Sequence, residues 1–336
     1  MSQQFLVAAE GFKKILLNQI PVIDVRAPIE FIQGHIPGSI NRPILSDEHR
    51  HEIGTVFKKK GQEAALYRGH ELVSGEYKEA MIQGWKTLID EKPDAIITCF
   101  RGGQRSQIAQ SWLSERGLVR PRIDGGYKAF RQFILDQLIR LSSQPMLIIS
   151  GATGSGKTLL IDRIKHDLPA IDLEGLANHR GSAFGHRTAP QPSQVDYENT
   201  LVQKLLQIES KAHHLPLIVE DESRMIGRTA QPEIFFNQLR SSEIILLEES
   251  LASRVQVIYD EYVLNNSQEE QTKAFARYEI SMQMISKKLG GLRFDELKTN
   301  LKEAILASTN HGDHTLHKLW IEIVSVVLRS ALLGFP

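Results

Sequence analysis

The segment GATGSGKT at residues 151–158 restricts the fold of this chain more than any other part of its sequence. It fits the pattern G-x-x-x-x-G-K-[ST] and lies between the apolar run MLIIS (146–150) and the amphipathic run LLIDRIKHDL (159–168). A strand, a glycine-rich loop and a helix in this order surround an anion with backbone N–H groups at the positive end of the helix. We therefore predict a phosphate site on a parallel sheet. Its predicted phosphate-binding residues are Gly151, Gly154, Ser155, Gly156, Lys157 and Thr158.

The phosphate loop alone does not identify the phosphate, since ATP and the diphosphate of another molecule present similar oxygens. A second apolar run, LPLIVE (215–220), ends in acidic residues, and an acid at such a strand end would hold Mg²⁺ through water. Thr158 and Asp221 are the predicted metal residues, with Glu220 as the alternative to Asp221; acids facing solvent would explain the same pattern. Basic residues of two polar segments are the predicted substrate contacts: Arg180, Arg187, Arg224 and Arg228. Ordinary basic residues of surface loops are the alternative interpretation of both segments.

The single cysteine of the chain, Cys99, ends the apolar run AIITC (95–99) and precedes FRGGQRS (100–106). Adjacent glycines let several backbone N–H groups point at one atom, while two arginines and the start of a helix add positive charge. Such a loop favours a thiolate, and it would hold the anionic outer atom of a persulfide or selenide on that sulfur. An inert, buried strand-end cysteine is the alternative. We name the predicted chalcogen loop by its residues: Cys99, Arg101, Gly102, Gly103, Arg105 and Ser106.

Strand-like runs alternate with helical patterns in both halves of the chain, which predicts an α/β fold with parallel sheets. The polar stretch SSQP (142–145) is the predicted domain boundary. We expect an N-terminal domain over residues 1–141, a phosphate-loop domain over 146–250 and a helical C-terminal region over 251–336.

Positive and negative charges balance, with Lys+Arg and Asp+Glu at 40 each, so any polyanion must bind to a local patch. The lone cysteine, the lack of a signal-peptide pattern and the shortness of the apolar runs predict a soluble cytoplasmic protein without membrane contact. The basic run Lys58-Lys59-Lys60, together with Arg50, His51 and Arg68, is a candidate RNA contact, and an ordinary solvated loop is the equally favoured alternative. Tyr67, Tyr77 and Trp85 could stack on a base, although core packing is the simpler interpretation of each.

Residues 20–41, IPVIDVRAPIEFIQGHIPGSIN, resemble the opening pattern of rhodanese domains. The Cys99 loop and Asp124-Gly-Gly-Tyr127 follow in the expected order, so the resemblance covers about residues 10–135. It implies a rhodanese-like fold with Cys99 at the centre of the active-site loop. We interpret Asp24 and Arg26 of this pattern as a structural ion pair.

The combination of this domain with a P-loop NTPase-like domain closely resembles the tRNA 2-selenouridine synthase family. The segments CFRGGQRS, NHRGSAFG (178–185) and EDESRMIG (220–227) carry the resemblance. It implies a selenotransferase and geranyltransferase that replaces sulfur by selenium in wobble 2-thiouridine. Selenophosphate would donate the selenium, and an S-geranyl intermediate would be made from geranyl diphosphate. Cys99 would then deliver selenium, and Lys157 would stabilise the departing diphosphate.

The implied partners are a tRNA with a 2-thiouridine wobble base and an enzyme that produces selenophosphate. Two alternatives stay open. One is an ATP-dependent tRNA sulfurtransferase, and the other is a non-catalytic RNA-binding protein with degenerate domains. The intact Cys99 and Lys157 argue against the second alternative, because no structural requirement would preserve either side chain.

Overall fold

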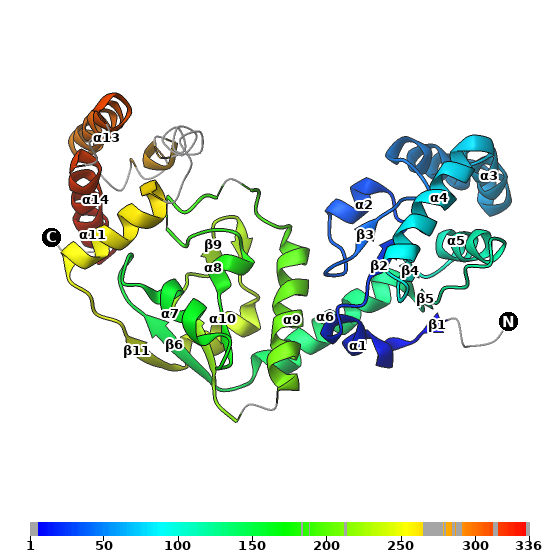
Figure 1. Cartoon of the computed structure of the whole chain (residues 1–336), viewed down its shortest axis with the longest axis horizontal. Helices are drawn as coiled ribbons and strands as arrows, with labels where there is room; N and C mark the ends of the chain where they lie inside the picture. Colours follow the sequence, from blue (N-terminus) through cyan, green and yellow to red (C-terminus); the bar gives the residue numbers. More distant parts are fainter. Residues whose placement is uncertain are drawn as a thin grey trace. The chain divides into compact units, whose positions relative to one another are not determined.

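The computed structural model describes residues 6–182, 184–187, 189–211, 214–264, 278, 280–283, 286, 291–311 and 315–333. It divides into two compact units (Figure 1). Unit 1 contains residues 1–143 and 192–212, and unit 2 contains residues 144–191 and 213–336. The first break lies inside the SSQP stretch. The predicted α/β fold, with a parallel sheet in each half of the chain, is confirmed.

Unit 1 is built on a sheet of five parallel strands in the order β1-β5-β4-β2-β3. The strands are β1 (Leu6–Val7), β2 (Val22–Asp24), β3 (Ile40–Asn41), β4 (Ile96–Thr98) and β5 (Arg122–Ile123). Strands β2 and β4 are buried on both faces, so their apolar residues are adjacent and do not alternate with polar ones. The chalcogen loop follows β4, the central strand, at the carboxyl edge of the sheet, where α/β proteins bind their ligands.

Most helices of unit 1 follow its strands in the sequence. They are η2 (Ala9–Gly11), α1 (Phe12–Leu17), α2 (Pro28–Ile32), α3 (Asp47–Leu72), α4 (Gly75–Glu91), α5 (Gln104–Ser114) and α6 (Gly126–Ser142). Helix α3 has two arms, because Gly61 is non-helical, with φ 84° and ψ −175°. The basic run Lys58-Lys59-Lys60 ends the first arm, so its prediction as a loop was wrong. Ser46 caps the helix by accepting from the His49 N–H group, and no break occurs before Gly61.

Helix α9 (Gln194–Ser210) also belongs to unit 1, although it lies within the predicted phosphate-loop domain. It packs against α1 and α6 (Figure 1). Its buried apolar residues are Tyr197, Leu201, Val202, Leu205 and Leu206. The predicted range 146–250 therefore needs a correction, because the amphipathic pattern of α9 gave no indication of which unit would cover its apolar face.

Unit 2 contains a sheet of four parallel strands in the order β11-β6-β8-β7. The strands are β6 (Met146–Ser150), β7 (Ala170–Ile171), β8 (Leu217–Glu220) and β11 (Glu243–Leu246). A separate hairpin pairs β9 (Met225–Ile226) with β10 (Thr229–Ala230). The helices of this part are α7 (Lys157–Ile164), α8 (Leu173–Leu176) and α10 (Glu233–Arg240).

The C-terminal region is helical where it is described, and it belongs to unit 2. Its elements are α11 (Leu251–Tyr259), the π-helical turn η3 (Asp260–Leu264), α13 (Gly291–His311) and α14 (Thr315–Leu333). Phe184, from the segment after α8, packs edge-on against Trp320 of α14, with ring centroids 5.6 Å apart. The C-terminal helices and the phosphate-loop part therefore share a core. No helix among the described residues combines the length and apolarity that a membrane crossing requires.

Candidate active sites

Cys99 is buried directly after β4, with 2% of its surface exposed. Its thiol donates to the Ser106 hydroxyl over 3.2 Å, and that hydroxyl donates to the carbonyl oxygen of Gly103 over 3.1 Å. Gly103 is also the N-cap of α5, so the helix begins within the loop. The predicted residues thus enclose the sulfur with a hydroxyl and a helix N-terminus.

Two glycines with left-handed backbones bring the Asp124-Gly-Gly-Tyr127 turn against the chalcogen loop. A Cβ atom on Gly126 (φ 61°) would lie 2.4 Å from the Cys99 carbonyl oxygen, and one on Gly102 (φ 63°) would lie 2.8 Å from the Gly126 nitrogen. The Tyr127 N–H group donates to the Cys99 carbonyl oxygen over 2.8 Å. Glycine is therefore required at both positions, because only it combines this backbone with so close an approach.

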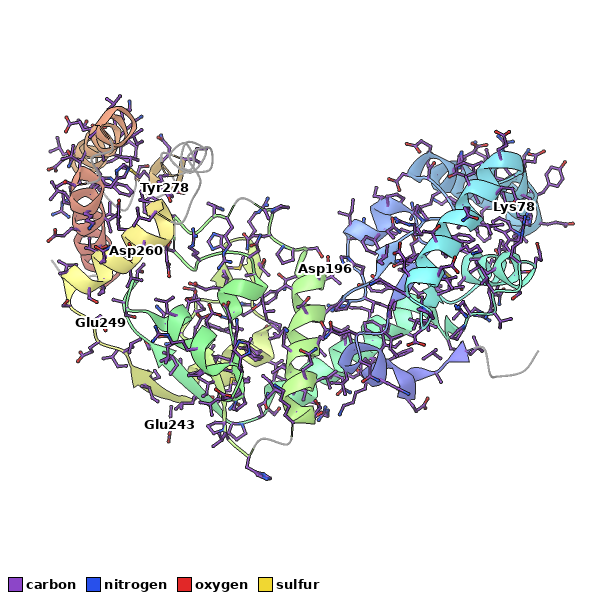
Figure 2. All side chains as sticks on the ribbon, viewed as in Figure 1. Lys78, Asp196, Glu243, Glu249, Asp260 and Tyr278 are labelled. Atoms are coloured by element: carbon purple, nitrogen blue, oxygen red, sulfur yellow. The ribbon has the colours of Figure 1, made fainter. Side chains whose placement is uncertain are left out.

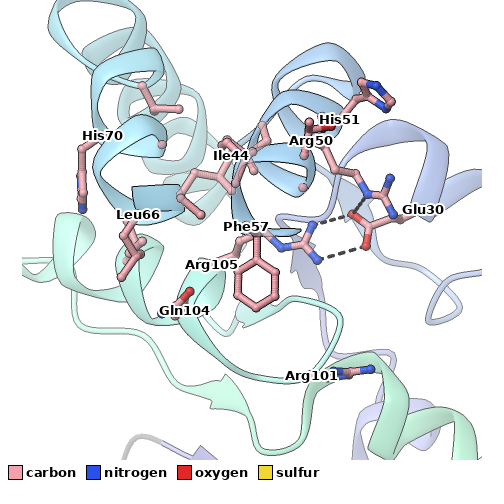
Figure 3. Close-up of a pocket in the computed structure, with 18 of the residues that line it drawn as sticks. Glu30, Ile44, Arg50, His51, Phe57, Leu66, His70, Arg101, Gln104 and Arg105 are labelled. Carbon is pink, nitrogen blue, oxygen red and sulfur yellow. Dashed lines mark hydrogen bonds and ion pairs between the residues drawn. The ribbon is translucent and has the colours of Figure 1, made fainter. Parts of the chain in front are cut away.

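Arg105 adds positive charge near the sulfur, and its pairing with a carboxylate was not predicted. Its guanidinium forms two bonds with the Glu30 carboxylate, and Arg50 lies 3.2 Å from the same carboxylate (Figure 3). Burial alone would raise the pKa of Glu30, but its bonds to Arg105 and the charge of Arg50 hold that pKa below its usual range. Two guanidinium groups share one carboxylate, so the cluster keeps a net positive charge. Arg101 is exposed beside the ring of Phe100.

Asp24 and Arg26 form a buried ion pair, 2.7 Å between Oδ2 and Nη2. Arg26 also donates to the carbonyl oxygen of Gly34 and stacks on the ring of Tyr127, 4.0 Å from its centroid. Since these contacts use the guanidinium inside the fold, the interpretation of this pair as structural agrees with the structure.

A cavity of about 750 Å³ opens beside the chalcogen loop (Figure 3). The two arms of α3 and the start of α5 form its walls. Its apolar lining consists of Ile44, Leu45, Ile53, Phe57, Ala65, Leu66, Val73, Ile108 and Trp112. Its charged and polar lining includes Glu30, Arg50, His51, Lys58, His70, Arg101, Gln104 and Arg105. Sequence analysis missed this cavity, because its walls come from segments whose packing no local pattern specifies.

In unit 2 the phosphate loop connects β6 to α7, as predicted. Gly154 and Gly156 have left-handed backbones, with φ of 80° and 85°. A Cβ atom on Gly154 would lie 2.6 Å from the carbonyl oxygen of Arg254, at the start of the C-terminal region. The Lys157 ammonium donates to the carbonyl oxygen of Gly151 over 2.9 Å, which curls the loop around its own centre. The Ser155 hydroxyl is buried and has no hydrogen-bond partner among the described residues.

The hydroxyl of Thr158 donates to the Glu174 carboxylate over 3.1 Å, whereas Asp221 contacts other residues. Asp221 accepts from the Ser150 hydroxyl over 2.6 Å and lies 3.3 Å from the Arg240 guanidinium. The structure therefore places Thr158 beside a carboxylate that sequence analysis did not identify. Glu174 follows the two-residue strand β7, which is too short to give a strand signal, although Asp172 as the N-cap of α8 marks the position.

Buried carboxyl groups gather next to the phosphate loop. Burial and the charges of Asp172 and Glu174 raise the pKa of Glu220 to about 8. Burial and the charges of Glu174 and Glu220 raise the pKa of Glu222 to about 8, while Lys157 opposes the shift. Glu222 donates to Glu174, and burial also raises the pKa of Glu174. The cluster combines oxygen donors with mutual repulsion, which a divalent cation would relieve.

The donor set fits Mg²⁺, which prefers oxygen ligands and usually binds to one or two carboxylates together with phosphate oxygens. Within the described residues no group of three or more His, Cys, Asp or Glu side chains is arranged to hold a metal ion by itself. An ion at this cluster would therefore share its coordination with a phosphorylated ligand.

The four predicted arginine contacts fall into two pairs. Burial raises the pKa of Glu261, and the charges of Arg180, Arg187 and Lys157 oppose this shift, so the field of all three cations reaches one carboxylate. Arg180 also donates to the carbonyl oxygen of Glu261 over 3.0 Å. Arg224 and Arg228 are exposed in the segment around β9 and β10. Of the four, Arg180 and Arg187 act on the same carboxylate as Lys157.

The aromatic candidates for base stacking differ in exposure. Trp85 is buried, with 1% of its surface exposed, as core packing predicted. Tyr67 and Tyr77 are 69% and 46% exposed, so their interpretation as core residues was wrong. Tyr67 lies in a shallow depression together with Lys60 and Arg68. This surface keeps both a cation and an aromatic ring available to a ligand.

The two units define a class of chain in which a rhodanese-like domain with a cysteine loop precedes a P-loop domain with a carboxylate cluster. A model of the rhodanese-like domain matches residues 8–133, and a model described as the tRNA 2-selenouridine synthase AAA domain matches residues 144–326. The chain belongs to the tRNA 2-selenouridine synthase family.

Curated proteins with this name are similar over nearly their whole length. The protein of Bdellovibrio bacteriovorus is 45% identical, over 94% of this chain and 88% of its own. The protein of Nitrosomonas europaea is 42% identical, over 94% and 89%, and that of Shewanella halifaxensis is 43% identical, over 95% and 89%. A solved N-terminal domain of a putative ATP/GTP binding protein from Clostridium difficile 630 is 29% identical over 39% of this chain, but its TM-score of 0.34 supports no structural argument.

Proposed function

We propose that this enzyme modifies tRNA by replacing sulfur with selenium in wobble 2-thiouridine, using selenophosphate and an S-geranyl intermediate made from geranyl diphosphate. Family membership supports the modification of tRNA with selenium. The observation that carries the proposal further is that one chain holds both an enclosed cysteine loop, in unit 1, and an intact phosphate loop, in unit 2. The first suits a chalcogen nucleophile, and the second suits a diphosphate leaving group.

Geranyl transfer requires stabilisation of a departing diphosphate. The thiocarbonyl sulfur of the base attacks the carbon of the geranyl group that carries the diphosphate, the carbon–oxygen bond breaks, and its electron pair leaves with the diphosphate. Lys157 and the backbone N–H groups of the loop bind the growing charge. Thr158, Glu174 and Glu220 would hold Mg²⁺, which would supply further positive charge to the leaving group.

Selenium transfer requires a nucleophilic selenium and a leaving group on the base. The Cys99 sulfur attacks the phosphorus of selenophosphate, the selenium–phosphorus bond breaks, and selenium leaves with its electron pair as hydrogen selenide. This selenide attacks C2 of the base, and the C2–sulfur bond breaks as geranylthiolate departs and takes a proton from water. Water then hydrolyses the phosphorylated cysteine to phosphate. No electrons are gained or lost, so the route needs no second thiol.

Cys99 as a carrier of selenide is the alternative form of the same role. Forming its sulfur–selenium bond from selenide-level selenium requires a two-electron oxidant, and releasing selenide from that bond requires a thiol other than Cys99, which is the single cysteine of the chain. An external thiol would then be required for each turnover, whereas activation of selenophosphate requires none. Thiol dependence of single-turnover selenation distinguishes the two forms.

The test uses an anticodon stem-loop RNA with 2-thiouridine at the wobble position, analysed by mass spectrometry of its nucleosides. With geranyl diphosphate alone, the full-length enzyme should form the S-geranyl nucleoside, and added selenophosphate should convert it to 2-selenouridine. Lys157→Ala should abolish geranylation, and Cys99→Ala should stop the reaction at the S-geranyl product. Geranylation by Lys157→Ala, or selenation by Cys99→Ala, would contradict the proposed roles.

Ligand binding distinguishes the proposed function from the alternative, an ATP-dependent sulfurtransferase. A ligand that binds only the folded protein raises its unfolding temperature. Geranyl diphosphate with Mg²⁺ should raise it by several degrees, and the increase should be lost in Lys157→Ala. Stabilisation by ATP but not by geranyl diphosphate would favour the sulfurtransferase.

A further inference from the structure

The cavity beside the chalcogen loop is held open by the two arms of α3. Their junction at Gly61 reverses the helix, and Arg68 of the second arm bonds to Glu52 of the first over 2.6 Å. The arms also lie against each other at Gly69, where an added Cβ atom would lie 3.5 Å from the Ile53 Cδ1 atom, an ordinary van der Waals distance. The arms therefore form a braced frame, and the space of about 750 Å³ that they border lies within the usual range of ligand sites, about 300–1,000 Å³.

The lining of this cavity combines an apolar part with charged and polar groups. Apolar side chains from both arms form much of its body, and the ring of Phe57 is 54% exposed. The arms also contribute charged and polar side chains to it: Arg50, His51, Lys58 and His70. Arg101, Gln104 and Arg105 of the chalcogen loop line it as well (Figure 3). An exposed aromatic ring beside an apolar cavity is unusual for packing alone, whereas a ligand with an apolar tail and a polar, anion-linked head matches both kinds of lining.

We propose that this cavity binds the geranyl chain of the S-geranyl-2-thiouridine base during selenium transfer. The inference rests on the proposed function, in which the geranyl group is the only apolar part of any reactant. Selenophosphate and the ribose-phosphate chain would bind poorly against apolar walls, because their polar groups would lose hydration there. With the chain in the cavity, C2 of the base lies toward the chalcogen loop, and the arginines at that end attract the selenium-bearing anion.

This arrangement also places the leaving group. When selenide attacks C2, the C2–sulfur bond breaks, and the electron pair goes to a sulfur atom still attached to the buried chain. The thiolate takes its proton from water, and geranylthiol leaves from the cavity. A 2-thiouridine base without the chain lacks this contact, so the cavity selects the activated base over its precursor.

The experiment measures the affinity of the full-length enzyme for three stem-loop RNAs that carry S-geranyl-, S-methyl- or unmodified 2-thiouridine. The wild type should bind the S-geranyl RNA at least tenfold more tightly than the S-methyl RNA, because only the longer chain reaches the apolar walls. Phe57→Asp should remove at least tenfold of this preference. Phe57→Leu should retain most of it.

Two more variants exclude a folding defect as the explanation. Ala65→Phe narrows the cavity from the second arm and should also reduce the preference, whereas Gln62→Phe, at an exposed position of the same arm, should not. Equal affinity of the wild type for the S-geranyl and S-methyl RNAs would overturn the inference, as would full preference in both Phe57→Asp and Ala65→Phe. A wild type that binds the S-geranyl RNA but never converts it to 2-selenouridine would overturn the proposed function instead.

Discussion

The side-chain amide of Asn199 donates to the backbone carbonyl oxygen of His35 over 2.7 Å, although 164 positions separate the two residues. The neighbouring Asp196, labelled in Figure 2, accepts from the His35 N–H group over 2.8 Å. Asn199 is fully buried and also accepts from Arg131 over 2.7 Å. These bonds fix α9 against the segment that follows the Asp24–Arg26 pair, so a helix from the middle of the chain completes the N-terminal unit.

We expect Asn199→Leu to destabilise unit 1 by about 1–3 kcal/mol, because the His35 carbonyl and the Arg131 guanidinium lose a buried partner. Amide hydrogen exchange at residues 34–36 and in α9 should accelerate, since a local probe follows one unit of a chain that has two. Lys204→Ala, at an exposed position of α9, is the control and should change the stability by less than about 0.5 kcal/mol. Unchanged exchange in Asn199→Leu would contradict the assignment of α9 to this unit.

Gly126→Ala should abolish selenium transfer. The added Cβ atom would lie 2.2 Å from the Gly102 nitrogen, so the chalcogen loop must move. Gly117→Ala is a matched control, because Gly117 also has a left-handed backbone, with φ 74°, but its Cβ would meet no atom within 4 Å. It should lose about 1–2 kcal/mol of stability and keep its activity. Selenation by Gly126→Ala at the rate of Gly117→Ala would show that the close approach is not required.

Glu209 of α9 should contribute a pH-dependent part of the stability. Its bond to Arg140, opposed by burial and supported by Lys13, lowers the pKa of Glu209 to about 2, against an ordinary value of 4.5. Because its pKa is lower in the folded state, the ionised Glu209 carboxylate stabilises the fold, and this stabilisation is complete above pH 4.5. It is lost as the pH falls from 4.5 to about 2, where the carboxylate becomes protonated. Each exposed pair is worth about 0.2–1 kcal/mol. Glu209→Gln should therefore be less stable than wild type at pH 7 in denaturant titrations, with the difference vanishing near pH 2 and shrinking in 1 M salt.

Glu174→Gln should weaken the binding of Mg²⁺ with geranyl diphosphate by about tenfold or more, because it removes a charged oxygen donor beside Thr158. Asp221→Asn, which tests the residue predicted from the sequence, should have a smaller effect, since Asp221 contacts Ser150 and Arg240. Titration of Mg²⁺ at a fixed concentration of geranyl diphosphate measures both. A larger loss of Mg²⁺ affinity in Asp221→Asn than in Glu174→Gln would support Asp221 as the metal ligand, as the sequence predicted.

The parts of each site that the sequence predicted are each formed by one short, continuous segment. Gly154, Gly156 and Lys157 belong to one turn, so their spacing alone specifies a backbone that surrounds an anion. Cys99 and its glycines are likewise contiguous. The DGGY turn was recognised only by resemblance, because its role depends on contact between Gly126 and Gly102, which no periodicity describes.

The residues that sequence analysis missed are brought together by packing over long separations. Glu30 pairs with Arg105 across 75 positions, and no local pattern predicts that this carboxylate shares the positive charge beside the sulfur. Glu174 follows a strand of two residues and joins Glu220 and Glu222 only once the sheet has formed. The exposure of Tyr67 was also unpredictable, since an aromatic residue on a helix gives the same pattern whether or not another segment covers it.

The position of α9 has a consequence for how the protein is made. The ribosome releases β6, the phosphate loop and α7 before it synthesises α9, yet α9 covers the apolar surface that α1 and α6 present. During synthesis the apolar surface of α1 and α6 therefore stays uncovered while the beginning of unit 2 emerges from the ribosome. Unit 1 is therefore not completed before the synthesis of unit 2 begins. A chain whose synthesis stalls shortly after the phosphate loop contains neither unit in full.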